Sequence, residues 1–575
     1  MTLALSTSTA LRPSKRLTKT TFALPPTRTI AEIPASDEGI PMSAHHSRDP
    51  VLVVGAGPTG LTIAAELLAR GVDCRVIDKR PGPLVTSRAF TLHARTLEGF
   101  ARAGCVDRFL ERGLRHRGMA FHFRGGAVER LDFTVLDTPY PYILVIEQQD
   151  TEAALREHLA SLGGSIEWNT RLDSVTTDSD GRITAVLDHT SRGGRGRTRM
   201  HPDWLVGCDG LHSTVRAHMG IDFPGDEYAG LQFRMMDARI ARYPVSTDEI
   251  HYFIDADHML LTTTLATGHR VLISDMRATP VANPAPDPHA ARNAFQPVVD
   301  DWLPGARLSV PQWTTEFPIW RRQATQYRRG RLLLAGDAVH VGSPAAGLGM
   351  NNCIQDAHNL GWKLAAAATG RAPEGLLDTY QAERLPIAVQ VGDASSMLHQ
   401  IMMAHGSSIQ DRLDIIRQQP DFPYQAAARI AGLTHHYRDV LTQPPGLPRL
   451  DGLTVGDRAP DIPVTSTTGV HDLLSHPYYT LLMLHRQAHS PVAGGLAEIT
   501  APYHDLVRTV VITSPDIPAD APTGALVAHD ARVHDLYGQP TDDTACLVRP
   551  DGHIALRIPA DPGTLHTALK ETVLT

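Results

Sequence analysis

The stretch from Val51 to Asp78 restricts the possible folds of this chain more than any other part of its sequence. It reads as a buried strand, a turn with the spacing Gly-x-Gly-x-x-Gly, a helix and a second strand that ends in an acidic residue. The three glycines are Gly55, Gly57 and Gly60. In such a βαβ unit the first permits a tight turn, the second lets the backbone approach a pyrophosphate, and the third allows close helix–strand packing. The pattern predicts a parallel α/β sheet that binds a dinucleotide.

The acidic residue at the end of this unit indicates which dinucleotide is bound. Asp78 stands eighteen residues after Gly60 and can accept hydrogen bonds from an adenosine ribose. A carboxylate disfavours a 2′-phosphate, so FAD or NAD is expected here rather than NADP. The glycines of residues 193–196 lack a flanking strand and helix, so this fingerprint occurs once. A nicotinamide donor would then have to visit a resident FAD transiently. The alternative is a glycine-rich turn without a ligand.

A second stretch, residues 331–365, predicts the other half of the ligand site. A buried strand ends in Gly336 and Asp337, and a loop with Pro344, Gly347 and Gly349 leads into an amphipathic helix. Open α/β sheets bind ligands at the carboxyl ends of their strands, so Asp337 is expected to accept a hydrogen bond from a ribityl hydroxyl. The helix N-terminus would stabilise an anionic reduced flavin by about 0.3–1 kcal/mol. The two stretches together favour FAD, and an ordinary helix cap is the alternative reading of Asp337.

A third strand end carries Asp209 and Gly210, after a buried strand predicted over residues 203–207. Asp-Gly turns are common, so this motif alone indicates little. Its value comes from its place in the sequence, between the other two strand ends.

The composition excludes several classes of partner. The 575 residues carry a net charge of −8 without a run of like charges, which gives no reason to expect nucleic acid or a membrane surface as a partner. No apolar stretch is long enough to span a bilayer. The five cysteines form no CxxC pair, and the histidine pairs have no metal-ligand spacing, so no metal site is predicted. A cytoplasmic enzyme is expected.

The first 48 residues differ from the rest of the chain. Residues 1–31 are rich in Ser, Thr and basic residues and contain no acid, a composition that also fits a transit peptide. A disordered extension is favoured, and a true start at Met42 is a further alternative.

The three strand ends together resemble the single-component FAD-dependent aromatic hydroxylases, which have the fold of 4-hydroxybenzoate and phenol hydroxylases. The resemblance runs from about Pro50 to Ala388 and includes the stretches SRAFTLHARTLE, DWLVGCDGLHSTVRAHMGIDFPG and LLDTYQAERLPIA. The tail resembles the thioredoxin-like domain of the larger members through VGDRAPDIP and LVRPDGHIALR, although it lacks paired cysteines and cannot exchange dithiols. A role for the tail in packing or dimer contact is expected.

The resemblance implies an α/β fold with three parts. These are a Rossmann-like FAD-binding βαβ domain, an inserted mixed or antiparallel β-sheet domain for substrate, and a C-terminal thioredoxin-like α/β domain. The expected boundaries are 1–48 for the extension; 49–120, 148–225 and 322–440 for FAD binding; 121–147 and 226–321 for substrate; and 455–575 for the tail.

The resemblance also implies a set of FAD-contacting residues, which spans all three strand ends. Arg88 would lie near the pyrophosphate, and Gln148 would contact the flavin, although Glu147 stands where proline is usual. The full expected set is Gly55, Gly57, Pro58, Thr59, Gly60, Asp78, Lys79, Arg88, Gln148, Asp209, Gly210, Gly336, Asp337, Pro344, Gly347, Gly349, Met350 and Asn351.

One departure from the family pattern concerns the catalytic base. Phenol-hydroxylase-like members place an Asp two residues after the SRA arginine, where this chain has Phe90. His93 is a possible substitute, but a lone histidine is more often structural. Alternatively, the substrate is acidic enough to ionise unaided.

The activity implied by the resemblance is hydroxylation of a phenolic or polyketide-like aromatic substrate. NADPH or NADH would reduce FAD, and O₂ would form a flavin C4a-hydroperoxide whose distal oxygen is transferred to the ring. The same fold could instead support a Baeyer–Villiger oxygenase, an epoxidase or a non-catalytic flavin-binding protein. The partner is an aromatic small molecule, and the chain is expected to be a monomer or homodimer.

Overall fold

The computed structural model describes residues 51–573 except 86–87, 192–193, 256–257, 276–286, 404–407, 419–420, 488–491, 493–494 and 518–523. The extension expected over residues 1–48 lies outside the described residues. Five hydrophobic clusters form the interior. Among the described residues, no helix combines the length and apolar character that crossing a bilayer requires.

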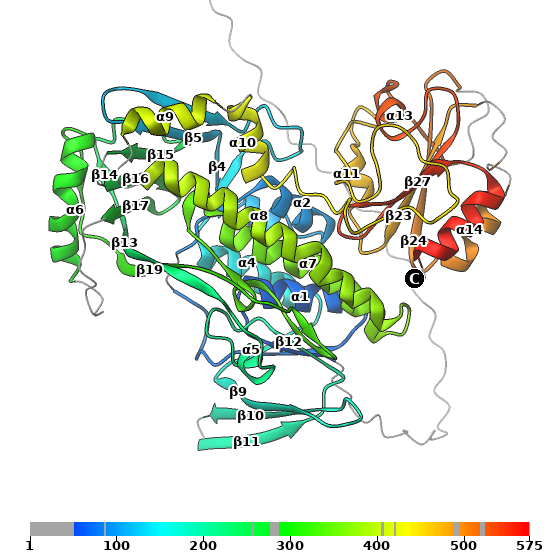
Figure 1. The fold of residues 1–575 in the computed structure, drawn as a ribbon, viewed down its shortest axis with the longest axis horizontal. Helices are drawn as coiled ribbons and strands as arrows, with labels where there is room; N and C mark the ends of the chain where they lie inside the picture. Colours follow the sequence, from blue (N-terminus) through cyan, green and yellow to red (C-terminus); the bar gives the residue numbers. More distant parts are fainter. Residues whose placement is uncertain are drawn as a thin grey trace, which may run out of the picture. The chain divides into compact units, whose positions relative to one another are not determined.

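A six-stranded sheet carries the nucleotide fingerprint. Its order is β20 (Arg328–Arg329), β21 (Leu332–Leu334), β12 (Trp204–Gly207), β1 (Val51–Val54), β2 (Cys74–Ile77) and β8 (Ile166–Glu167), parallel except for β20. Three helices pack with this sheet: α1 (Pro58–Leu68), α4 (Gln148–Ser161) and α7 (Leu348–Ala368). Figure 1 shows α7 lying along α1. The βαβ unit predicted from the glycine spacing is present.

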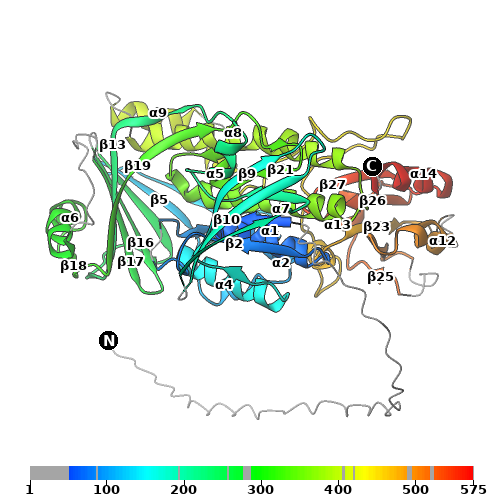
Figure 2. The ribbon, with the colours of Figure 1, turned by 90° about the horizontal axis from the view of Figure 1, so that it is seen from below.

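A second, eight-stranded sheet is built mainly from the middle of the chain. Its order is β22 (His340–Val341), β19 (Trp313–Gln323), β13 (Gly225–Ala238), β17 (Gly268–Asp275), β16 (His258–Leu265), β15 (Glu249–Ile254), β5 (Gly118–Phe123) and β6 (Val128–Asp132). The sheet is mixed, because β15 and β5 are parallel while the other neighbours are antiparallel. Figure 2 shows β13 and β19 running side by side along it.

The two faces of this sheet are separated by the period of two along each strand. On β13, Phe233 and Met235 belong to one apolar cluster, whereas Met236 faces the cluster formed with α6 (Pro288–Trp302). The first face packs against the helices α8 (Asp378–Met403), α9 (Ile409–Arg417) and α10 (Phe422–Ile430). One face of the sheet is therefore directed away from the helix α6 and toward the interior.

Smaller elements complete this part of the chain. They are α2 (Ala94–Arg102), α3 (Asp107–Leu110), α5 (Thr214–His218), the sheet β3–β7–β4 (Thr91–Leu92, Ile143–Val145, Leu114–His116), the sheet β9–β10–β11 (Thr170–Thr177, Ile183–Ser191, Gly194–Met200) and the pair β14–β18 (Ile240–Ala241, Arg307–Leu308).

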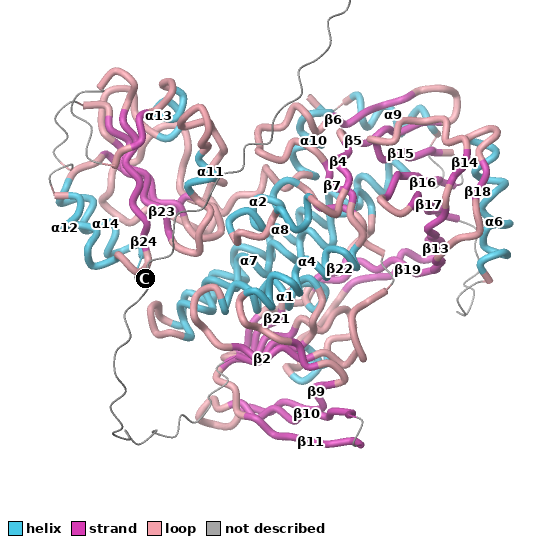
Figure 3. The backbone as a smooth tube through the Cα atoms, turned by 180° about the vertical axis from the view of Figure 1, so that it is seen from behind, coloured by secondary structure: helices cyan, strands magenta, loops and turns pink. Residues whose placement is uncertain are grey.

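The tail forms its own α/β unit, as expected. A five-stranded sheet has the order β25 (Leu526–Val527), β24 (Val507–Thr513), β23 (Tyr479–His485), β26 (Thr544–Val548) and β27 (Ile554–Pro559). Its helices are α11 (Val470–Leu473), α12 (Leu496–Thr500), α13 (Arg532–Tyr537) and α14 (Pro562–Val573). Figure 3 shows these strands as a separate sheet. All five cysteines are free thiols.

Candidate functional site

The three strand ends singled out in the sequence meet at one edge of the six-stranded sheet. The register pairs Val54 with Gly207 and Gly207 with Leu334, so the chain leaves β1, β12 and β21 at the same level. A cavity of about 1220 Å³ opens there and extends to the apolar face of the eight-stranded sheet. Typical pockets for a single small ligand measure about 300–1,000 Å³. This cavity therefore has room for a dinucleotide and a second molecule.

The glycines of the fingerprint have distinct surroundings. Gly55 has φ +107°, and a Cβ there would lie 2.3 Å from the carbonyl oxygen of Cys208. A Cβ on Gly60 would lie 1.9 Å from the carbonyl oxygen of Gly55, so α1 packs directly on the turn. A Cβ on Gly57 would meet no atom within 4 Å, and Gly57 lines the cavity. No side chain caps the start of α1, which leaves its first N–H groups available to an anion.

Asp78, which directly follows β2, lines the cavity. Its carboxylate accepts hydrogen bonds from the backbone N–H of Ala56 (2.8 Å) and from the backbone and side chain of Arg80 (2.8 and 3.0 Å). Burial alone would raise the pKa of Asp78, but these bonds outweigh it and lower the pKa. The lowered pKa keeps the carboxylate ionised. Because Asp78 and Lys79 both line the cavity, the carboxylate can still accept a hydrogen bond from a ribose.

Asp337 lies shortly after β21, which is three strands away from β2 in the sheet, and also lines the cavity. The Asp337 side chain is exposed to the cavity, and the protein that surrounds its carboxylate raises its pKa by partial desolvation. The thiol of Cys353 donates to it at 3.3 Å, and the charge of Arg88 counteracts the rise. The Arg88 guanidinium itself lies 4.9 Å from the centroid of the Phe317 ring. Because the protein offers this carboxylate few hydrogen-bond donors and little compensating charge, the carboxylate is suited to accept hydrogen bonds from a ligand.

The loop before α7 adopts a conformation that most residues avoid. Ala346 and Gly347 have φ of +58° and +67°, and a Cβ on Gly347 would lie 2.0 Å from the Thr91 hydroxyl oxygen. Asn351 fixes this loop by donating to the carbonyl oxygens of Thr91 (3.0 Å) and Gly347 (2.9 Å). It also accepts from the backbone N–H of His93 at 2.8 Å. Asn351 therefore shapes the loop instead of lining the cavity.

His93 is likewise turned inward. Its Nε2 lies 2.9 Å from the carbonyl oxygen of Ala346, its side chain is buried, and burial lowers its pKa to about 4. His93 is absent from the cavity lining, as are Gly60, Gly336 and Asn351. The structure thus places the candidate base as a support for the strained Ala346.

The other members of the expected cofactor set all line the cavity. They are Gly55, Gly57, Pro58, Thr59, Asp78, Lys79, Arg88, Gln148, Asp209, Gly210, Asp337, Pro344, Gly347, Gly349 and Met350. Gln148 occupies the first turn of α4, which begins at that residue, and donates to Glu152 at 3.0 Å. The neighbouring Glu147 accepts from Thr267 at 3.2 Å and lies outside the lining.

The sequence assigned the second half of the cavity to the predicted substrate-binding sheet but named no residue of its wall. Its wall is apolar and comes mainly from the inner face of the eight-stranded sheet, and we call it the apolar chamber. The chamber consists of Phe233, Met235, Tyr252, Met259, Leu261, Leu272, Phe317 and, from α8, Met402. The alternation along residues 230–275 was the available signal, but it does not show which face meets a ligand. Arg80 and Glu152 were also missed.

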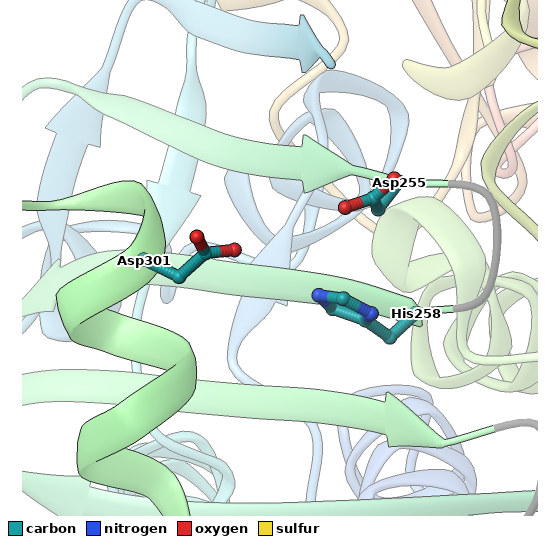
Figure 4. A group of neighbouring side chains, drawn as sticks. All are labelled: Asp255, His258 and Asp301. Carbon is teal, nitrogen blue, oxygen red and sulfur yellow. The ribbon is translucent and has the colours of Figure 1, made fainter.

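A separate cluster of potential metal ligands is formed by Asp255, His258 and Asp301. Figure 4 shows their side chains pointing toward one another, and their ligand atoms lie within 4.8 Å of each other. However, the Arg124 guanidinium donates to Asp255 at 2.9 Å and also pairs with Asp301. Since the two carboxylates share this cation, the cluster is an ion-pair group.

The geometry fits FAD on three counts. An uncapped helix start meets an open glycine at the phosphate end, two strand-end carboxylates line the cavity, and a second uncapped helix start follows Gly347. The fold and the cavity define a dinucleotide-dependent enzyme with an attached apolar substrate chamber.

Comparison with known proteins identifies the family. The model for the FAD binding domain matches residues 48–395, and the model for the aromatic-ring hydroxylase C-terminal domain matches residues 453–573. Pentachlorophenol 4-monooxygenase from Sphingobium chlorophenolicum is 37% identical over 90% of this chain and 95% of its own length. The 6-methylpretetramide 4-monooxygenase of Streptomyces rimosus is 33% identical over 88% and 90%.

A solved structure agrees with these relatives. OxyS anhydrotetracycline hydroxylase from Streptomyces rimosus superimposes with a TM-score of 0.72 and 29% identity, covering 92% of this chain and 99% of that one. The chain belongs to the family of FAD-dependent aromatic monooxygenases, as its sequence motifs indicated. FAD is accordingly its cofactor, and O₂ and a reduced nicotinamide are its co-substrates. The alternative of a flavin-binding protein without turnover is not supported.

Proposed function

We propose that this enzyme hydroxylates a phenolic ring held in the apolar chamber. One oxygen atom of O₂ enters the ring and the other leaves as water, with NADPH or NADH supplying the two electrons. When bound, reduced FAD supplies the activation of O₂ at its C4a position. The protein supplies orientation and a water-poor cavity.

The single observation that carries this proposal is the continuity of the cavity. The nucleotide cleft and the apolar chamber are one space, and the loop of Pro344 and Gly347 lies in its lining. An isoalloxazine along that loop would present its edge to a ring in the chamber. The names of the relatives support aromatic substrates of this kind, since one is a pentachlorophenol 4-monooxygenase and others are a 6-methylpretetramide 4-monooxygenase and an anhydrotetracycline monooxygenase.

The residue roles follow the positions in the cavity. Gly57 and the start of α1 would hold the pyrophosphate, and Asp78 the adenosine ribose. Asp337 would accept from the ribityl chain, and the start of α7 would face the pyrimidine edge, where reduced flavin carries negative charge. The tail, which has no CxxC pair, would serve as a packing module.

The first test is an absorption spectrum of the purified protein, followed by NADPH and NADH oxidation with a panel of phenols and polycyclic quinones. Oxidation that rises with added substrate, together with a product hydroxylated on the ring, is expected. An ester, a lactone or an epoxide would show instead that a Baeyer–Villiger or epoxidase reaction takes place on this fold.

The placement of the ribityl chain is tested by Asp337→Ala. Loss of a hydrogen bond to a charged group costs about 1.5–3 kcal/mol, which corresponds to about a 10- to 100-fold weaker affinity for FAD. The dissociation constant of FAD, measured by quenching of its fluorescence, gives this value. Unchanged FAD affinity would show that the ribityl chain lies elsewhere.

A further inference from the structure

Residues 344–349, which we call the glycine loop, depend on support from another part of the chain. Ala346 has φ +58°, a left-handed conformation that a residue with a side chain keeps only when its surroundings hold it. Its carbonyl oxygen lies 2.9 Å from Nε2 of His93, and the Thr91 hydroxyl donates to the carbonyl oxygen of Gly347 at 3.4 Å. Both contacts come from the segment that directly precedes α2. The conformation of the glycine loop therefore depends on how α2 is held.

The tail holds the first turn of α2. Arg95, the second residue of this helix, is buried, and its guanidinium donates to the backbone carbonyl oxygen of Asp551 at 2.8 Å. Asp551 lies in the turn between β26 and β27, 456 positions later in the chain. The same guanidinium donates to Glu98, one helical turn further on, at 3.1 Å. Arg95 therefore joins the start of α2 to a turn of the tail.

Glu98 makes the second contact of α2 with the tail. Its side chain is fully buried, and both of its carboxylate oxygens accept from the guanidinium of Arg458, near the start of the tail. Burial would raise the pKa of Glu98, but the positive charge of Arg458 outweighs it and holds the pKa well below its usual range. Since a buried carboxylate needs such a partner, the stable position of α2 depends on the tail.

The same turn of the tail also contacts the other helix that borders the glycine loop. α7 begins within this loop, at Leu348, and Asn359 on α7 donates to the Asp551 carboxylate at 3.4 Å. Asn351, near the start of α7, accepts from the backbone N–H of His93 at 2.8 Å. Both helices that border the loop are thus in contact with the tail and with each other.

We propose that the tail positions the isoalloxazine by holding α2, whose preceding residues support the glycine loop. This role goes beyond that of a packing module. It rests on the proposed function in one respect, the placement of the isoalloxazine along this loop. Arg95 and Arg458 act as positioning residues, since neither lines the cavity.

The test compares FAD binding by Arg458→Met and Arg95→Met with that of the wild type. Once its support is lost, the loop can relax, and FAD must restore the left-handed conformation when it binds. That conformation costs about 1–3 kcal/mol, which corresponds to an affinity about 5- to 150-fold weaker. We expect a loss within this range from quenching of FAD fluorescence. We also expect an altered visible circular dichroism spectrum of the bound flavin, because this spectrum reports the asymmetry of the flavin's surroundings.

The two variants approach the contact from opposite sides. Arg458→Met leaves α2 itself unaltered and decides the question if Arg95→Met does not fold. Unchanged FAD affinity and an unchanged spectrum in Arg458→Met would overturn the role of the tail. A loss confined to Arg95→Met would assign the effect to α2 alone, with the same consequence.

Arg557→Met is the matched control. Arg557 is also a buried arginine of the tail, but its guanidinium donates to carbonyl oxygens of the tail and its linker, among them those of Tyr537 (2.8 Å) and Leu453 (2.9 Å). Its replacement should destabilise the tail while FAD affinity and the flavin spectrum stay unchanged. Equal losses of FAD affinity in Arg557→Met and Arg458→Met would show that general stability of the tail is responsible, and would overturn the inference.

Gly347→Ala separates this inference from the placement of the flavin. A Cβ at Gly347 would lie 2.0 Å from the Thr91 hydroxyl oxygen, so this variant displaces the glycine loop directly. If it weakens FAD binding whereas Arg458→Met does not, only the role of the tail is wrong. If Gly347→Ala binds FAD normally, the isoalloxazine lies elsewhere, and the placement in the proposed function is wrong as well.

Discussion

Two regions of this molecule surround charged groups in opposite ways. In one, which we call the ionic seam, Lys363, Glu383, Arg549 and Asp551 join the tail to α7 and α8. Arg549 donates to both carboxylate oxygens of Glu383 at 2.8 Å, and Lys363 donates to the same carboxylate at 2.8 Å. In the cavity, Asp337 has a thiol at 3.3 Å as its hydrogen-bond donor.

The pKa values of Glu383 and Asp337 shift in opposite directions, which shows the difference between the two regions. Burial would raise the pKa of Glu383, but the charges of Arg549 and Lys363 outweigh it and lower the pKa to about 2. Burial raises the pKa of Asp337, and its nearby charges do not compensate. A buried charge that the protein itself satisfies belongs to the scaffold, whereas one left facing a cavity is suited to a ligand.

The largest effect is expected from breaking the seam with Arg549→Met. Removing one partner of a buried ion pair leaves an uncompensated charge and costs about 3–5 kcal/mol. Because Lys363 remains beside Glu383, the loss should fall at the lower end. The midpoint of urea unfolding, followed by near-ultraviolet circular dichroism, measures it.

The control for the seam is Arg331→Met, since the Arg331–Glu374 pair is exposed. Exposed pairs contribute about 0–1 kcal/mol, so its midpoint should barely move. If the two variants unfold at the same urea concentration, the seam has no special role in stability.

Substitutions of two glycines in the same turn should have different effects, one on protein stability and the other on FAD binding. A methyl group at Gly60 would collide with the backbone of Gly55, so Gly60→Ala should cost about 1–3 kcal/mol of stability. A methyl group at Gly57 would project into the cavity. Gly57→Ala should therefore retain most of the stability but lose at least about tenfold in FAD affinity, roughly 1.4 kcal/mol. Urea unfolding and FAD titration of both variants measure these effects. Normal FAD binding by Gly57→Ala would refute the prediction.

The pH dependence of stability should have opposite signs in the two regions. The folded protein holds the Asp337 proton to higher pH than the unfolded chain does, so this group's contribution falls as pH rises above the ordinary aspartate pKa of 3.8. The slope is at most about 1.4 kcal/mol per pH unit, and less where cavity water screens the charge. Glu383 contributes fully above its ordinary pKa of 4.5, and this contribution is lost as pH falls toward about 2.

Asp337→Asn isolates the cavity contribution. In FAD-free protein this variant should no longer lose stability as pH rises above the ordinary aspartate pKa of 3.8. The loss of stability at low pH, which comes from Glu383, should remain. Urea midpoints between pH 3 and pH 7, in roughly half-unit steps, would show this. Parallel curves for the variant and the wild type would contradict the raised pKa.

The smallest effect is expected at the group of Asp255, His258 and Asp301. Since Arg124 pairs with both carboxylates, a chelator should change neither FAD content nor the unfolding midpoint. A drop in either after treatment with EDTA, reversed by a divalent cation, would make this group a metal site.

The sequence by itself determined the parts that depend on local geometry. The glycine spacing, the acid at the end of β2 and the strand–loop–helix of residues 331–365 predicted the βαβ unit. Together with the family resemblance that the sequence motifs carry, they indicated fifteen residues that line the cavity. These features can be recognised in the sequence because a tight turn, a close approach of two backbone segments and a strand end each require a particular residue type at a particular position.

Only the tertiary structure decided which side chains face the cavity. His93 and Asn351 stand next to the site in sequence, yet both support the Ala346–Gly347 loop, because their partners come from residues more than 250 positions away. The chamber face of the eight-stranded sheet depends in the same way on strands and helices brought together by packing. Contacts between distant segments are set by the burial of whole surfaces, and no local pattern of residues records them.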